Sequence, residues 1–147
     1  RAVSASGPIV SRGFARRMNA SMALIDKRRP KPNEAEIVHL VGDVAGKTAI
    51  LIDDMIDTGG TFAQAAHALK RNGAVAVYGC ATHALLSRDA SRRLQEAPFE
   101  EVCVANTLHI PPDRRFPRLQ VLSIAGLLGK AITYNHEYQS VSSLFPE

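Results

Sequence analysis

The stretch I-L-I-D-D-M-I-D-T-G-G-T, residues 50–61, places three carboxylates, two hydroxyls and two glycines directly after an apolar run. Its candidate ligand-binding residues are Asp53, Asp54, Asp57, Thr58, Gly59, Gly60 and Thr61. Carboxylates this close to one another repel, so we expect a group from outside the chain to compensate their charge. The hydroxyls donate hydrogen bonds, and the glycines let a phosphate approach the backbone without meeting a Cβ.

The flanking residues place this stretch between a strand and a helix. The run K-T-A-I-L-I-D (47–53) is typical of a buried strand, and apolar residues then recur at helical spacing from Phe62 to Leu69, before Gly73. Ligands of open α/β sheets bind beyond the carboxyl ends of the strands. A helix N-terminus at the same place points several N–H groups and the positive end of its dipole at an anion.

These features predict a phosphomonoester bound by residues 57–61. Asp53 and Asp54 are then expected to accept hydrogen bonds from sugar hydroxyls, directly or through a bound Mg²⁺. A phosphate at one end and a diol at the other describe ribose 5-phosphate. The alternative is an ordinary surface turn with capping residues, but the position at a strand-to-helix junction favours a ligand site.

The rest of the sequence alternates between strand and helix patterns. Strands are expected at 22–26, at 35–42 and 47–53 around a turn from Gly42 to Gly46, and at 75–81, 100–106 and 119–124. Helices are expected at 9–18, from near Phe62 to Gly73, at 87–97 with Ser87 as N-cap, and at 125–137. The predicted fold class is α/β, with a single doubly wound, mostly parallel sheet flanked by helices, in one domain spanning residues 1–147.

Composition excludes several classes of protein. The chain has 147 residues, and its 46% hydrophobic content is sufficient for a core. No run approaches the ~18 apolar residues that span a bilayer, so we expect no membrane partner. Cys80 and Cys103 lie in apolar, strand-like runs without metal-ligand spacing, which favours buried free thiols and a cytoplasmic protein.

The positive charge is concentrated near the start of the chain. Residues 1–31 carry eight basic side chains and one acidic one, whereas the rest carries ten basic and thirteen acidic groups. The basic segment is short and lacks interleaved aromatic residues, so we expect no nucleic-acid partner. A compact anion such as a nucleotide or sugar phosphate explains the charge at least as well.

The stretch 50–61 resembles the ribose-phosphate binding motif of type I phosphoribosyltransferases and of synthases of phosphoribosyl diphosphate (PRPP). From about Phe14 to Phe145 the chain resembles the C-terminal half of a ribose-phosphate pyrophosphokinase. The segments that carry the resemblance are ALIDKRRPKPNEAE, VGDVAGKTAILIDDMIDTGGT, YGCATHALLS, VANTL and SVSSLF. The resemblance implies a phosphoribosyltransferase-like domain that acts on ribose 5-phosphate and ATP.

The reaction that this resemblance implies is attack of the ribose C1 hydroxyl on the β-phosphorus of ATP, which releases AMP and forms PRPP. Lys27 and Arg29 match the loop cations that act on the migrating diphosphate, with Arg29 also in the substrate site. Ser142 and Ser143 match serines of a regulatory pocket between subunits. Mg²⁺ and a homo-oligomer are expected.

The sequence also departs from this family. Where the family has an acidic, glycine-rich loop whose aspartate helps to hold Mg²⁺, residues 3–8 read V-S-A-S-G-P. The family's N-terminal half, which supplies most of the ATP site, is expected to be missing from this chain. Two alternatives stay open: a non-catalytic regulatory homologue, and a standalone type I phosphoribosyltransferase.

Overall fold

The computed structural model describes residues 2–5, 8–28 and 37–145, with side chains described over 13–25 and 40–145. The strands are β1 (Ala2–Ala5), β2 (Ser21–Arg28), β3 (Ile37–Val41), β4 (Thr48–Ile56), β5 (Ala76–Ala84), β6 (Glu101–Ala105) and β7 (Leu119–Leu122). The helices are α1 (Pro8–Arg17), α2 (Gly60–Arg71), α3 (Ala90–Glu96) and α4 (Ala125–His136), with short 3-10 helices η1 (Pro112–Arg114) and η2 (Val141–Leu144).

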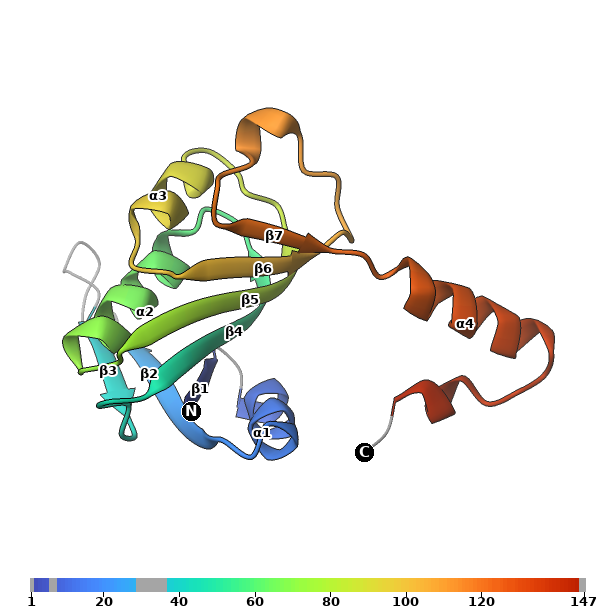
Figure 1. The fold of residues 1–147 in the computed structure, drawn as a ribbon, viewed down its shortest axis with the longest axis horizontal. Coiled ribbons are helices and arrows are strands. Elements are labelled where there is room, and N and C mark those ends of the chain that lie inside the picture. Colours follow the sequence, from blue (N-terminus) through green and yellow to red (C-terminus); the bar gives the residue numbers. More distant parts are fainter. Residues whose placement is uncertain (1, 6–7, 29–36, 146–147) are drawn as a thin grey trace.

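The strands form one sheet in the order β3-β2-β1-β4-β5-β6-β7, and helices lie on both of its faces (Figure 1). Every neighbouring pair is parallel except β2 and β3. The predicted class, a doubly wound and mostly parallel sheet, is therefore confirmed. Two details differ: β3 and β4 flank the Gly42–Gly46 turn without pairing, and the short strand β1 was not expected.

Strand β4 is longer than its sequence suggests. It was expected to end at Asp53, but it continues through the acidic pair to Ile56. The extension is held by pairing with β5, where Met55 lies opposite His83 and Ile56 opposite Ala84. Because successive side chains of a strand point to opposite faces, Asp53 and Asp54 project to different sides of the sheet.

One face of the sheet packs against α2 and α3 and forms the main core. The helical spacing expected after Gly60 is confirmed, since Phe62 and Leu69 of α2 are buried, with three alanines between them. Phe62 stacks on Phe99 with 5.2 Å between ring centroids. Gly79 of β5 makes this possible: a Cβ there would lie only 2.6 Å from Phe62 Cε1.

The other face is covered only in part. Ala15 of α1 packs on Ile52 of β4, and Cys80 of β5 lies at the margin of this small cluster. Farther along the same face, Leu122 of β7 is 60% exposed. The part of this face near β7 therefore has no helix packed over it among the described residues.

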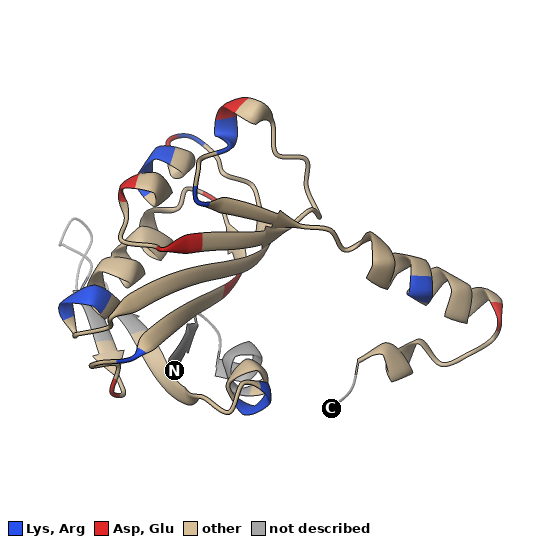
Figure 2. Ribbon diagram, in the orientation of Figure 1, with Lys and Arg blue, Asp and Glu red and all other residues tan. Residues whose placement is uncertain are grey.

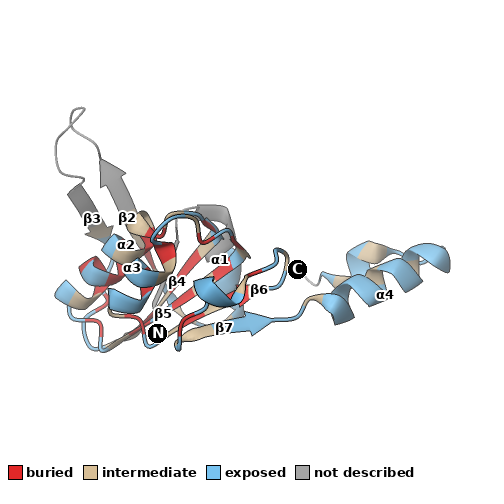
Figure 3. Ribbon diagram, turned by 90° about the horizontal axis from the view of Figure 1, so that it is seen from above, coloured by how far each residue is buried: buried red, intermediate tan, exposed pale blue. Residues whose placement is uncertain are grey.

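Helix α4 leaves the sheet after β7 and projects away from the body (Figures 1 and 3). None of its residues is buried, and Leu127, Leu128 and Ile132 are 44%, 51% and 70% exposed. Its main contact is with η2. Among the described residues, no helix is long and apolar enough to cross a membrane.

We predict that Gly79→Ala destabilises the protein by about 1–3 kcal/mol, because the new methyl group overpacks the Phe62–Phe99 stack. Gly13→Ala is the control, since a Cβ at Gly13 of α1 meets nothing within 4 Å. Urea unfolding of the parent and both variants measures the difference. Gly13→Ala should keep or raise the midpoint, because alanine is favoured over glycine inside a helix. If Gly79→Ala unfolds at the midpoint of the parent or above it, the packing argument is wrong.

Candidate functional site

The site is built at the junction of β4 and α2, where only residues 57–59 separate strand from helix. Gly59 adopts a left-handed conformation, with φ 69° and ψ −6°. A Cβ at this position would lie 3.4 Å from the Ala90 backbone and from Leu94 Cγ of α3. Glycine is therefore favoured here for two reasons, its positive φ and the close approach of α3.

The first turn of α2 presents its N–H groups to this junction. Ala63 N donates to the Gly59 carbonyl oxygen at 2.9 Å, which is the first hydrogen bond of the helical pattern. The backbone N–H groups of the three residues before Ala63 therefore have no acceptor within the helix. No side chain within the described ranges caps the helix. Together with the helix dipole, these N–H groups favour an anion at the N-terminus of α2.

A cavity of about 170 Å³ lies at this end of the helix. Its lining includes Asp53, Asp57, Thr58, Gly59, Thr61 and Phe62. The structure thus brings together one carboxylate of β4 and most of the loop that the sequence singled out. Gly60 begins α2 just beside it, without positive φ, and a Cβ on Gly60 would meet only Arg93 Nη1 at 3.6 Å and Thr58 Oγ1 at 4.0 Å.

A second cavity, of about 340 Å³, lies on the partly covered face of the sheet. Its lining includes Cys80, Cys103 and several apolar residues. Asp54 also lines this cavity and not the loop cavity. Asp53 lines both cavities, and its Oδ1 accepts a hydrogen bond from Asp54 N at 2.8 Å. The adjacent carboxylates thus border two different spaces.

Asp57 is held by the loop that follows β5. Ser87 Oγ donates to Asp57 Oδ1 at 2.5 Å, and Ser87 N donates to the Asp57 carbonyl oxygen at 2.9 Å. The expectation that Ser87 caps the next helix is wrong, because Asp89 occupies that position and its side chain makes no capping bond. Two non-glycine residues of the same loop, Leu86 and Arg88, have positive φ. Such conformations cost free energy and are often retained at functional sites.

Arg93 of α3 is the residue that sequence reasoning missed. Its Nη1 donates to the Thr58 carbonyl oxygen at 3.2 Å, and Arg93 itself does not line the loop cavity. The peptide is trans, so fixing this C=O toward α3 turns the Gly59 N–H the opposite way. Figure 2 shows basic residues on α3 and η1, all of them arginines. No local pattern could have identified Arg93, because the contact joins residues 35 positions apart.

The remaining predicted residues lie elsewhere or are not described. Lys27 belongs to β2, but its side chain lies outside the described side chains, and Arg29 lies outside the described residues altogether. Ser142 and Ser143 lie in η2, beyond α4, and both are exposed. Ser143 Oγ donates to the Ser140 carbonyl oxygen at 2.7 Å.

The described residues fit Mg²⁺ only as an ion shared with a substrate. They contain no group of three or more His, Cys, Asp or Glu side chains that could hold a metal. Mg²⁺ is commonly held by one or two carboxylates together with waters and phosphate oxygens. Asp53, at the wall of the loop cavity, is the carboxylate that could supply such a bond.

Comparison with known proteins identifies the family. A family described as phosphoribosyl synthetase-associated domain matches residues 5–146, nearly the whole chain. The chain belongs to this family. Among its curated relatives, a ribose-phosphate pyrophosphokinase of Gloeobacter violaceus is 56% identical over 136 residues, which cover 92% of this chain and 41% of the relative.

Solved structures agree with this assignment. Phosphoribosylpyrophosphate synthetase of Mycobacterium smegmatis matches with a TM-score of 0.83 and 46% identity, over 93% of this chain and 45% of that one. An adenine phosphoribosyltransferase of Rhodothermus marinus matches with a TM-score of 0.54 and 15% identity, over 84% of this chain and 66% of that one, which shows a shared fold alone. This member of the phosphoribosyl synthetase-associated family thus spans less than half the length of the synthetases it matches.

We predict that Arg93→Gln loosens the loop at Gly59, because the Thr58 carbonyl oxygen loses its charged donor. The backbone order parameter of Gly59 should fall from about 0.85 toward 0.6 or below. Arg92→Gln is the matched control: Arg92 is the neighbouring residue of α3, and its Nη2 lies 3.7 Å from Asp89. NMR relaxation of ¹⁵N-labelled protein measures both, and an unchanged Gly59 in Arg93→Gln would exclude this role.

Proposed function

We propose that this chain is the C-terminal, ribose-phosphate-binding half of a ribose-phosphate diphosphokinase, folded as one phosphoribosyltransferase-like domain over residues 1–147. The observation that carries the proposal is the loop cavity, where Asp53 faces a glycine-containing loop under the N-terminus of α2. The names of the relatives, pyrophosphokinase and phosphoribosylpyrophosphate synthetase, support the same activity. Ribose 5-phosphate is the substrate that suits this lining, because its phosphate matches the loop and its hydroxyls match the Asp53 carboxylate.

In the proposed complex, the 5-phosphate accepts hydrogen bonds from the backbone N–H groups at Gly59–Thr61 and from the Thr58 and Thr61 hydroxyls. Asp57 fixes the loop through Ser87 rather than contacting the phosphate, because its carboxylate is also an anion. Asp53 accepts hydrogen bonds from the ribose hydroxyls, with Asp54 beside it. Because the loop binds the phosphate and Asp53 binds the hydroxyls, the sugar is held at two points, which fixes the orientation of its C1 hydroxyl.

The chemical step is attack of this C1 hydroxyl oxygen on the β-phosphorus of ATP, with AMP as the leaving group and PRPP as the product. A phosphoryl transfer of this kind depends on positioning and on stabilisation of negative charge. We assign the cationic part of that task to Lys27 and Arg29. Mg²⁺, when bound, supplies further positive charge beside the phosphates.

Two other functions are alternatives, that of a standalone phosphoribosyltransferase and that of a non-catalytic regulatory homologue. A standalone phosphoribosyltransferase is less well supported. The adenine phosphoribosyltransferase of known structure is 15% identical to this chain, whereas the phosphoribosylpyrophosphate synthetase is 46% identical. A non-catalytic regulatory homologue remains the second candidate. It is favoured by residues 3–8, V-S-A-S-G-P, which lack the aspartate of the acidic loop.

The partners follow from the same proposal. We infer a cytoplasmic homo-oligomer in which Ser142 and Ser143 contribute to a regulatory pocket, with no nucleic-acid or membrane partner. The exposed apolar residues of α4 and the partly covered sheet face are surfaces that isolated monomers rarely expose.

We predict that the chain is larger than a monomer in solution. Multi-angle light scattering across a dilution series should give a mass above 15.9 kDa that falls on dilution. Ile132→Glu, on the exposed face of α4, should shift the mass toward the monomer. A constant monomer mass at high concentration contradicts the oligomer.

The binding site is tested by calorimetry on the chain itself. We predict that ribose 5-phosphate binds and that ribose binds at least about tenfold more weakly, a difference of roughly 1.4 kcal/mol. Gly60→Val should remove binding without unfolding the protein, because its Cβ has room on the protein side but narrows the approach of a phosphate. Asp53→Asn should weaken ribose 5-phosphate but spare inorganic phosphate.

The control is Gly126→Val, in the first turn of α4, where a Cβ meets nothing within 4 Å. It should bind like the parent. If Gly60→Val binds ribose 5-phosphate as tightly as Gly126→Val, the loop is an ordinary turn. If the parent binds neither sugar phosphate nor inorganic phosphate, the proposed function of this chain is wrong.

A further inference from the structure

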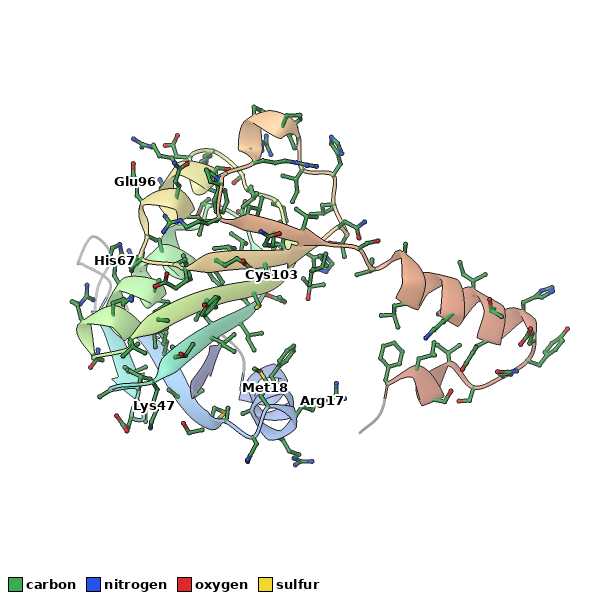
Figure 4. All side chains as sticks on the ribbon, in the orientation of Figure 1. Arg17, Met18, Lys47, His67, Glu96 and Cys103 are labelled. Atoms are coloured by element: carbon green, nitrogen blue, oxygen red, sulfur yellow. The ribbon has the colours of Figure 1, made fainter. Side chains whose placement is uncertain are left out.

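The two cysteines of the chain lie opposite each other on neighbouring strands. Cys80 of β5 and Cys103 of β6 are direct partners in the parallel pairing, and both are free thiols of intermediate exposure. Figure 4 labels Cys103 on β6, between β5 and β7. Residues paired in this way project to the same face of the sheet, so the two thiols stand side by side.

Both thiols open into the 340 Å³ cavity on the partly covered face. Most of the cavity wall is apolar, formed by residues such as Phe14, Ile52 and Leu122, and Asp53 and Asp54 are its two carboxylates. The cavity is large enough for a small aromatic group beside the sulfurs. It therefore combines a pair of soft donors with an apolar surface.

We propose that Cys80 and Cys103 form a dithiol site for trivalent organoarsenicals, compounds in which one arsenic atom bridges two sulfurs. The reaction is a condensation without redox change. An arsenoxide R–As=O and two thiols give R–As(S)₂ and one water: two As–S bonds form, the arsenic–oxygen bonds break, and both thiol protons leave with the oxygen. No oxidant is needed.

A direct disulfide fits this pair less well than a bridged one. Neighbouring strands lie about 4.8 Å apart, and side chains paired in register keep roughly that separation at Cβ. A disulfide needs about 3.8 Å between Cβ atoms, so it would draw β5 and β6 together. An arsenic atom between the sulfurs lengthens the bridge by one atom and leaves the strand spacing unchanged.

The environment also keeps single-thiol chemistry slow. Burial raises the pKa of Cys80 to about 11, with the neighbouring Cys103 and then Glu101 as further causes. Burial and Glu101 raise the pKa of Cys103 as well. Alkylating agents react with the thiolate, so they act slowly at neutral pH. An arsenical bound to one thiol is captured by the second in an intramolecular step, which raises its affinity for the pair.

Phenylarsine oxide tests the proposal on the parent chain at pH 7. Native mass spectrometry should show one arsenical per chain, with the loss of one water, and the adduct should resist a large excess of a monothiol while 2,3-dimercaptopropanol removes it. Cys80→Ala and Cys103→Ala, each keeping one thiol, should lose at least about 100-fold in apparent affinity. Their unchanged thermal unfolding shows that the loss is not misfolding.

Two results would overturn the dithiol site. One is a parent chain that takes up two arsenicals, one per cysteine. The other is an adduct that a monothiol removes from the parent as readily as from either single variant. These outcomes are independent of the proposed function, because none of them requires ribose 5-phosphate to bind.

Discussion

The turn between β4 and α2 has only three residues in which to lead the chain from a central strand into a helix. Gly59 meets this constraint with a left-handed conformation, and α3 approaches so closely that a side chain there would meet Ala90 and Leu94. Because α3 lies against the turn, Arg93 reaches the Thr58 carbonyl oxygen and the loop before α3 places Ser87 on Asp57. The geometry of the site therefore depends on α3 packing as much as on the loop sequence.

That dependence explains what the sequence could and could not predict. The helical spacing from Phe62 to Leu69 and the glycines of the loop are local signals, so the strand, turn and helix were predicted in the right order. Ser87 and Arg93 act on partners 30 and 35 residues away, and nothing near them in sequence distinguishes Arg93 from Arg92. Only the register of β4 on β5 and the packing of α3 bring these residues to the loop.

The acidic pair shows a second limit of local reasoning. Aspartate is unfavourable in strands, so the sequence predicted that β4 ends at Asp53. Pairing with β5 overrides that preference, because the backbone of Met55 and Ile56 gains partners on β5 at the carboxyl ends of the two strands. The consequence is that only Asp53 of the pair lines the loop cavity, whereas both carboxylates line the apolar one.

Asp53 and Asp54 consequently lie between the loop cavity and the partly covered face of the sheet. At present water reaches both carboxylates, and their repulsion is screened. If a further domain or another subunit covered this face, water would leave and the charged forms of the two carboxylates would become less favourable unless a cation joined them. Covering of the apolar face and binding of a cation between the two carboxylates are then coupled, since each makes the other more favourable.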